Sequence, residues 1–469
     1  MKYKRVMIAS PKSGSGKTTI TCALLQALKN KGYQTVSFKC GPDYIDPMFH
    51  EKVIGVPSKN LDTFFTDEEQ TRKLFLDSAP EEGISVMEGV MGIFDGLGGI
   101  RKEGSSYHLA EVTGTPILFA ADAKGMGRSI LPLLAGFLSY DKSRLIRGVI
   151  LNRISKGYYE ILKPLIEEEL GISVLGFFPE KEDLRVESRH LGLVMPGELQ
   201  GIQRKLQAAA EEFAEHISIE GVLKIAEGAD RELKGIKERY KEKYKEKSKV
   251  TGIKYTKAHP VIAVAKDEAF CFYYADNLRM LAESGAELKY FSPLHDKDLP
   301  ENCHALLFGG GYPELYAKGL SENTSMLAAV RRAVESGMPV VAECGGFMYL
   351  HSEIVDKDGI RYACAGVIPA KCSFMGRLVR FGYIELQEKE SHFLPEGGKI
   401  KGHEFHYFDS TDNGKDVLAV KPATGRTYPC IISGENYWMG FPHLYYPSNP
   451  KFAENFVKKA EKYREEGRG

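Results

Sequence analysis

Apolar and polar positions alternate in blocks through residues 5–195. Short apolar runs rich in β-branched residues, which are typical of buried strands, are separated by longer stretches with helical periodicity. The first run, 6–9, leads into a glycine-rich loop, and residues 18–29 continue as an amphipathic helix. Further strands are expected at 35–38, 84–87, 116–120 and 149–151. This alternation predicts a parallel sheet covered by helices, with ligands at the carboxyl ends of its strands.

The alternation stops over residues 231–250, which are mostly lysine, glutamate and arginine, and then resumes. Strands are expected again at 261–265, 287–291, 305–308 and 339–342, and an antiparallel piece at 382–386. A chain of 469 residues also exceeds the usual size of one core. We therefore predict the α/β class with two domains, at 1–225 and 260–469, joined by a charged linker at 226–259.

Composition excludes several classes of protein. Lysine plus arginine equals aspartate plus glutamate, at 63 each, so no net charge draws the chain to nucleic acid or to anionic lipid. No apolar run approaches the roughly 18 residues of a membrane span, and the run after the basic N-terminus is too short for a signal peptide. The eight cysteines are scattered without a C-x-x-C pair, which is typical of a reducing compartment. We predict a cytoplasmic protein.

The glycine-rich loop indicates a nucleotide site. Residues 12–18 are Lys-Ser-Gly-Ser-Gly-Lys-Thr, between a strand and a helix, where backbone N–H groups, a lysine and a hydroxyl can hold phosphates and Mg²⁺. Pro11 stands where the strict pattern has its first glycine, so the loop resembles the K-G-G-x-G-K-T variant of dethiobiotin synthetase-like and MinD-like ATPases. Asn152, at a later strand end, is a candidate adenine contact. The predicted nucleotide-binding residues are Lys12, Gly14, Gly16, Lys17, Thr18, Thr19 and Asn152.

Four carboxylates follow neighbouring strands. Asp43 and Asp46 lie in the loop 41–47, and Glu88 and Asp95 lie in 86–96. We predict that they form the reaction site, with Mg²⁺ held by Thr18, Asp46 and Glu88. The alternative is that Asp43 and Asp46 only form turns beside prolines.

A second candidate site surrounds Cys344. It follows an apolar strand and precedes Gly345 and Gly346, a pattern that permits a tight turn exposing a nucleophilic sulfur. His443 is the candidate base, and the glycines of 309–314 could supply further oxyanion N–H groups. The alternative is an inert core cysteine. Residues 403–406, His-Glu-Phe-His, lack the i, i+4 histidine spacing of a zinc helix, so no metal is expected there.

Four long signatures, at 38–47, 265–274, 309–316 and 402–406, resemble those of the cobyrinic acid a,c-diamide synthase family, and the resemblance covers nearly the whole chain. It implies an ATP-binding amidoligase domain like dethiobiotin synthetase, followed by a class I glutamine amidotransferase domain. It implies Cys344 as nucleophile and His443 as base, with ATP, L-glutamine and Mg²⁺ as co-substrates and cofactor. The implied reaction amidates the a and c acetates of a tetrapyrrole, cobyrinic acid, through acyl phosphates in cobalamin biosynthesis.

Two positions depart from related sequences, and two other functions stay open. Tyr445 stands where most class I glutaminases have the glutamate of H-x-E, and Lys12 stands where many members have a neutral residue. One alternative is the same chemistry on another tetrapyrrole, such as nickel-sirohydrochlorin or a sirohaem-type acid. The other is a regulatory P-loop ATPase of the partitioning type, with Lys12 acting across a dimer. A homodimer is compatible with the amidoligase as well, and no nucleic-acid or membrane partner is expected.

Overall fold

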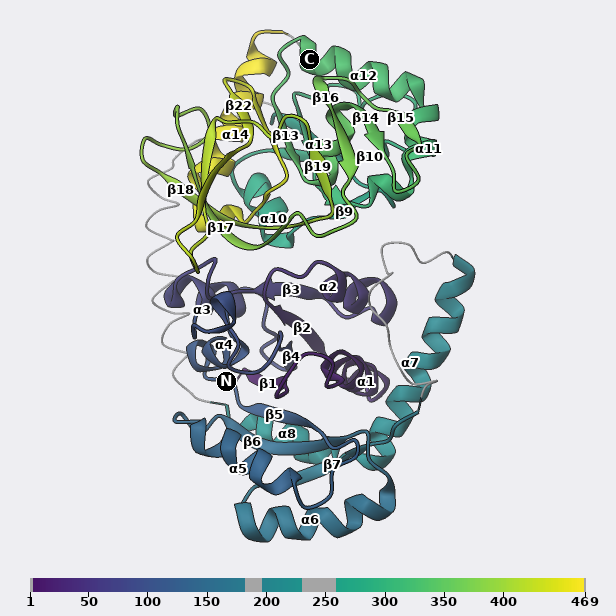
Figure 1. Cartoon of the computed structure of the whole chain (residues 1–469), viewed down its shortest axis with the longest axis vertical. Coiled ribbons are helices and arrows are strands. Elements are labelled where there is room, and N and C mark those ends of the chain that lie inside the picture. The colour runs from purple at the N-terminus through teal and green to yellow at the C-terminus, as the bar shows by residue number, and fades with distance from the viewer. Residues whose placement is uncertain (1–2, 182–195, 230–258, 468–469) are drawn as a thin grey trace. The chain divides into compact units, whose positions relative to one another are not determined.

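The computed structural model describes residues 3–181, 196–229 and 259–467 (Figure 1). The chain divides into two compact units, 1–253 and 254–469. The last described helix of the first unit ends at Glu227, two residues beyond the predicted boundary at 225. Most of the expected linker, 226–259, lies outside the described residues, so its structure stays a prediction.

The first unit is built on a parallel sheet of seven strands in the order β3-β2-β4-β1-β5-β6-β7 (Figure 1). Most strands are nearly fully buried because both faces are covered, which explains their continuous apolar runs. The strands are β1 Lys4–Ala9, β2 Thr35–Cys40, β3 Ser58–Leu61, β4 Ile84–Glu88, β5 Ile117–Asp122, β6 Ile146–Asn152 and β7 Val174–Phe178.

Helices cover both faces of this sheet. On one face α1, α7 and α8 share a core with Ile8, Leu118 and Ile150. On the other, Phe75 of α3 packs on Phe38 and Phe137 of α5 packs on Phe119. The helices are α1 Lys17–Asn30, α2 Ile45–Phe49, α3 Glu68–Leu76, α4 Ser106–Thr113, α5 Ile130–Tyr140, α6 Lys156–Leu170, α7 Pro196–His216 and α8 Ile219–Glu227, with short η1 His50–Ile54 and η2 Leu97–Gly99.

The second unit has a mixed six-stranded sheet in the order β10-β8-β11-β13-β23-β22, of which only the edge strand β22 runs antiparallel. Its strands are β8 Val261–Ala265, β10 Glu287–Phe291, β11 Ala305–Phe308, β13 Val340–Glu343, β22 Ile432–Gly434 and β23 Tyr437–Gly440. Its helices are α10 Ala275–Glu283, α11 Ala317–Glu322, α12 Thr324–Glu335, α13 Gly345–Leu350 and α14 Lys451–Glu465, with short η5 Pro313–Leu315 and η6 Tyr446–Ser448.

Three smaller sheets complete the second unit. They are β12-β9, β15-β14-β16-β19 and the five-stranded β21-β20-β17-β18-β24. Their strands are β9 Phe270–Phe272, β12 Gly310–Gly311, β14 His351–Val355, β15 Arg361–Ala363, β16 Ile368–Phe374, β17 Arg380–Glu388, β18 Lys399–His406, β19 Phe408–Ser410, β20 Val417–Val420, β21 Thr427–Cys430 and β24 His443–Leu444. The predicted two-domain α/β class is confirmed. Among the described helices, none has the length and apolar character needed to cross a bilayer.

Candidate functional site

The glycine-rich loop joins the end of β1 to the start of α1. Gly16 caps the helix with φ 87°, a left-handed conformation that glycine adopts without steric cost. A Cβ at this position would lie 2.2 Å from the Asn152 side-chain nitrogen. That nitrogen donates a hydrogen bond to the Ser15 carbonyl at 2.7 Å. Asn152 therefore supports the loop from β6, and its predicted contact with adenine stays a prediction.

Lys17 is held at the start of α1 by neutral oxygens. Its ammonium donates to Ser10 Oγ at 2.9 Å and to the carbonyls of Met91 and Lys12 at 2.5 and 3.3 Å. Burial, and then the Lys39 ammonium, lower the pKa of Lys17 to about 8. Phosphate oxygens carry negative charge, so they would be stronger partners for this ammonium than the neutral groups it now contacts.

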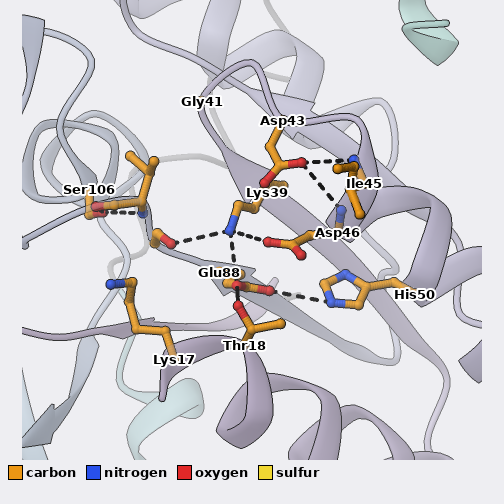
Figure 2. Close-up of polar contacts among 12 residues, drawn as sticks. Lys17, Thr18, Lys39, Gly41, Asp43, Ile45, Asp46, His50, Glu88 and Ser106 are labelled. Carbon is orange, nitrogen blue, oxygen red and sulfur yellow. Dashed lines mark hydrogen bonds and ion pairs between the residues drawn. The ribbon is translucent and has the colours of Figure 1, made fainter. Parts of the chain in front are cut away.

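Lys39 lies at the centre of a buried charged network (Figure 2). Its ammonium contacts Asp46 Oδ2 at 2.5 Å and Glu88 Oε1 at 2.9 Å. Thr18 Oγ1 donates to the same Glu88 oxygen at 2.6 Å, and His50 Nε2 lies 3.4 Å from the other. The structure thus brings together Thr18, Asp46 and Glu88, the three residues predicted to hold Mg²⁺.

The charges of this network depend on one another. The carboxylates of Asp46 and Glu88 outweigh the effect of burial and raise the pKa of Lys39, so its ammonium stays charged. Burial alone would raise the pKa of Glu88, but Lys39, then His50 and Thr18, hold it well below its usual range. Burial, and then Glu88, raise the pKa of Asp46. A cation beside Asp46 would favour its ionised form.

The residues present fit a magnesium ion. Asp46 Oδ1 is buried and has no hydrogen-bond partner among the described residues, and it lies in the same network as the Thr18 hydroxyl. Mg²⁺ is usually bound by one or two carboxylates together with phosphate oxygens and water, rather than by a cage of protein ligands. Asp46, Glu88 and Thr18 would supply the protein's share of such a site.

Asp43 and Asp95, the other two predicted carboxylates, have different contacts. Asp43 Oδ1 accepts hydrogen bonds from the backbone N–H of Ile45 at 2.7 Å and of Asp46 at 3.4 Å. Asp95 Oδ2 accepts from the Gly92 N–H at 3.0 Å. Both side chains therefore form local turns, which was the alternative weighed for Asp43. Their charges still act on the site. Asp43 raises the pKa of Lys39, and Asp95 raises the pKa of Lys17 against the stronger lowering effect of burial.

Two members of the network were missed by sequence reasoning. Lys39 is the penultimate residue of β2, just before the acidic loop, and its position near a strand end beside two acidic segments was the available signal. His50 lies in the short helix η1, where no motif marks it, and its Nδ1 is 2.7 Å from Ser37 Oγ. Lys12 is exposed, while its carbonyl accepts from Lys17.

In the second unit, Cys344 occupies a strained turn between β13 and α13. Its φ and ψ are 48° and −102°, outside the regions that a residue with a Cβ normally adopts. The turn needs small neighbours: a Cβ on Gly346 would lie 2.4 Å from Phe308 Cβ, and one on Gly345 would lie 2.8 Å from Pro313 Cδ. Strain of this kind is maintained by the surrounding packing and is frequent at catalytic nucleophiles.

His443 begins β24, which pairs with β18 so that His443 is opposite His403. The two imidazoles stack with centroids 4.9 Å apart and planes at 16°. Strands β13 and β23 are adjacent and parallel, with Glu343 opposite Gly440, so Cys344 and His443 both follow the carboxyl ends of neighbouring strands. A Cβ on Gly310 would lie 2.3 Å from His443 Cε1. The glycine loop therefore packs directly on the candidate base.

Burial sets the protonation of both groups. It lowers the pKa of His443 to about 3, with His406 adding to the effect, so the imidazole is neutral near pH 7. It raises the pKa of the Cys344 thiol, and the Glu314 carboxylate raises it further. The resting pair is thus a neutral thiol and a neutral base. Gly311 N would lie 3.1 Å from a Cβ on Gly345, so the loop 309–314 borders the nucleophile, and its oxyanion role stays a prediction.

Comparisons with known proteins agree with this geometry. Residues 6–194 match the family model for a CobQ/CobB/MinD/ParA nucleotide binding domain. Residues 261–443 match the model for a CobB/CobQ-like glutamine amidotransferase domain. The phosphate loop and the Lys39 network lie in the first match, and Cys344 and His443 lie in the second.

Curated relatives match nearly end to end. The cobyrinate a,c-diamide synthase of Thermoplasma volcanium is 38% identical over 470 residues, covering 99% of this chain and 98% of its own. That of Caldanaerobacter subterraneus is 38% identical over 449 residues, covering 93% of this chain and 94% of its own. That of Priestia megaterium is 35% identical over 472 residues, covering 100% of this chain and 99% of its own. The chain, with its nucleotide-binding and glutamine amidotransferase domains, belongs to the cobyrinate a,c-diamide synthase family.

Proposed function

We propose that this protein uses ATP and glutamine to amidate the a and c acetate carboxylates of cobyrinic acid. One observation carries the proposal: a strained cysteine and a buried histidine follow the ends of neighbouring strands in one unit, and a phosphate loop lies beside a buried Lys39–Asp46–Glu88 network in the other. The two sites correspond to the two half-reactions of such an enzyme. The substrate is inferred from relatives that span nearly the whole chain and are cobyrinate a,c-diamide synthases.

In the glutaminase half, Cys344 Sγ attacks the side-chain amide carbon of glutamine while His443 accepts the thiol proton. The strained turn holds the sulfur at the carboxyl end of β13, and backbone N–H groups near Gly345 and Gly311 would stabilise the oxyanion. His443 then gives its proton to the departing nitrogen, which leaves as ammonia. Water hydrolyses the resulting thioester to glutamate and returns the thiol.

In the synthetase half, a substrate carboxylate takes the γ-phosphoryl group of ATP, and ammonia then displaces phosphate from the acyl phosphate to form the amide. Lys17 and the loop N–H groups hold the phosphates. Thr18, Asp46 and Glu88 would hold Mg²⁺, which would neutralise phosphate charge when bound. Lys39 holds the carboxylates of Asp46 and Glu88 in place. Asp43 and Asp95 shape the loops on either side.

The cysteines support a reducing compartment. All eight are free and buried, among them Cys22 and Cys430, as expected of a protein in a reducing compartment. We infer that the reaction takes place in the cytoplasm.

The test is an amidation assay read by mass spectrometry. Purified protein is incubated with Mg·ATP, glutamine and, separately, cobyrinic acid, nickel-sirohydrochlorin and sirohydrochlorin. We expect a diamide of cobyrinic acid that requires both ATP and glutamine. Preferred turnover of nickel-sirohydrochlorin would replace the substrate but keep the chemistry. ATP hydrolysis that needs neither glutamine nor a tetrapyrrole, with no amide formed, would support the partitioning-type ATPase instead.

A further inference from the structure

The glutaminase site has no glutamate at the position where H-x-E motifs have one. Tyr445 occupies it, and its hydroxyl donates to Asp276 Oδ2 at 3.2 Å. Asp276 also accepts a hydrogen bond from the Arg279 guanidinium at 2.8 Å, so its carboxylate is paired with Arg279. A histidine base needs a partner that fixes its tautomer and ring orientation. Another group must therefore provide what the glutamate provides elsewhere.

We propose that Glu343, the residue directly before the nucleophile, is the positioning carboxylate of His443. Its Oε2 lies 3.9 Å from His443 Nδ1, and both side chains are almost completely buried, at 6% and 3% exposure. This inference rests on the proposed glutaminase half-reaction.

The position of Glu343 is fixed by the central sheet of the second unit. Glu343 is the last residue of β13, a central strand, and is paired with Gly440 of β23 three residues before His443. Its other oxygen accepts from the Tyr446 hydroxyl at 3.4 Å, and the Leu444 backbone also hydrogen-bonds to it. One residue after Glu343 the chain makes the strained Cys344 turn. One strand end thus supplies both the nucleophile and the group that orients its base.

The remaining neighbours of His443 leave its ring little freedom. His403 stacks on one side, and Gly310 packs at Cε1 with no room for a Cβ. His403 Nδ1 is in turn 3.2 Å from the Tyr274 hydroxyl. The 3.9 Å between Glu343 and His443 is longer than a hydrogen bond, and contacts of catalytic groups often shorten only when substrate binds.

The chemistry of the pair fits the half-reaction. Burial raises the pKa of Glu343 to about 8 and lowers that of His443 to about 3, so near pH 8 a large share of Glu343 is ionised beside a neutral imidazole. When His443 takes the thiol proton, the Glu343 carboxylate accepts the Nδ1–H and stabilises the new imidazolium. No further reactant is needed, because the thiol proton leaves with ammonia.

The test uses Glu343→Gln, which keeps the size of the side chain but cannot ionise, and the assay is run near pH 8. We expect kcat for glutamine hydrolysis to fall about 10- to 100-fold with KM changed less than about twofold, a smaller loss than in serine triads because a thiol is intrinsically nucleophilic. Alkylation of Cys344 by iodoacetamide should need a higher pH. Tyr445→Phe removes the bond to Asp276 and should leave both measurements unchanged. Retained ammonium-driven amidation shows that the variant is folded.

A double variant separates positioning from general support. In a His443→Ala background, Glu343→Gln should cause no further loss, because a residue that acts only through His443 has nothing left to orient. An equal loss in both backgrounds, or a Glu343→Gln enzyme with unchanged kcat and alkylation profile, would overturn the proposal. If the wild-type protein hydrolyses no glutamine, the proposed function fails before the role of Glu343 is tested.

Discussion

The two candidate sites of this chain are organised by different forces. The phosphate-loop site concentrates Lys17, Lys39, Asp46 and Glu88, and the pKa of each of these groups is shifted by charges of the others. In the thiol site, burial keeps the cysteine and its histidine uncharged, and glycines with no room for a side chain surround them. One site is defined by charge and the other by close packing.

This difference predicts opposite sensitivities. Isosteric changes that remove charge should damage the first site, which acts on anionic phosphates and carboxylates. Changes that add volume should damage the second, where activation depends on a strained turn and on the position of one imidazole. The predictions below test this contrast, beginning with the largest expected effect.

Lys17→Ala should lower amidation with either glutamine or ammonium about 10²- to 10³-fold, because it removes the cation that meets the phosphate charge. Steady-state rates of diamide formation with both nitrogen donors measure it. Lys31→Ala, an exposed lysine directly after the helix that Lys17 begins, is the matched control, and a loss of less than about threefold is expected. Normal ammonium-driven amidation by Lys17→Ala would remove the phosphate-loop assignment.

The four carboxylates should separate into two pairs. Asp46→Asn and Glu88→Gln should each lower kcat for synthesis by more than about tenfold, or 1.4 kcal/mol, because both belong to the Lys39 network. Asp43→Asn and Asp95→Asn should lose less, since an amide oxygen can still accept the backbone hydrogen bonds that these turns need.

Glutamine hydrolysis and the unfolding midpoint are the controls for this set. Removing a partner of a buried ammonium also costs stability, so the Asp46 and Glu88 variants should unfold at somewhat lower temperature while remaining folded at the assay temperature. Four folded variants with near-normal synthesis would show that these loops do not form the amidation site.

Gly310→Ala should lower glutamine hydrolysis about tenfold and spare ammonium-driven synthesis. The added Cβ would lie 2.3 Å from His443 Cε1, so the imidazole has to move. Gly319→Ala, in α11 of the same unit, meets only Leu294 Cδ2 at 3.3 Å and should leave hydrolysis near normal. Equal rates for the two variants would argue against a packing-defined site.

The last of these predictions concerns the acid stability of the fold rather than a reaction rate. His443 has a folded pKa of about 3, below its usual unfolded value of about 6.5. Between about pH 6.5 and pH 3 the unfolded chain binds more protons at His443 than the folded chain does. The free energy of unfolding therefore falls as the pH drops below about 6.5, and the stabilising contribution of neutral His443 is fully lost by about pH 3. His443→Gln should therefore gain stability relative to the wild type between pH 7.5 and 4.5, by at most about 3 kcal/mol. A difference in unfolding midpoint between the two proteins that stays constant from pH 7.5 to 4.5 would contradict this.

The strands and the phosphate loop were predictable because their signals are local. Buried parallel strands leave continuous apolar runs, and the loop needs glycines and a lysine at fixed spacing. The predicted strand at 116–120 begins instead at Ile117, since Pro116 has no N–H to donate, and extends to Asp122. Strand β3, Ser58–Leu61, was missed because its sequence, Ser-Lys-Asn-Leu, is mostly polar.

The partners of the candidate residues could not be predicted, because they depend on register between distant strands. The contact between Lys39 and Glu88 requires β2 and β4 to be adjacent with these two residues opposite each other. The contact between Glu343 and His443 requires β13 beside β23. Burial then decides the pKa of each group, and no spacing along the chain reports it. The turn-forming bond of Asp95 was equally invisible, and turn formation by Asp43 was only the alternative, which is why the sequence grouped four carboxylates that the structure separates.

The central claim is a division of labour between the two sites, and Cys344→Ala tests it most directly. The variant is assayed for diamide formation with glutamine and, in parallel, with ammonium as nitrogen donor at saturating Mg·ATP. The account predicts loss of essentially all glutamine-driven synthesis with ammonium-driven synthesis within about twofold of the wild type, because only ammonia generation uses the thiol. Equal loss with both nitrogen donors in a folded variant would contradict it.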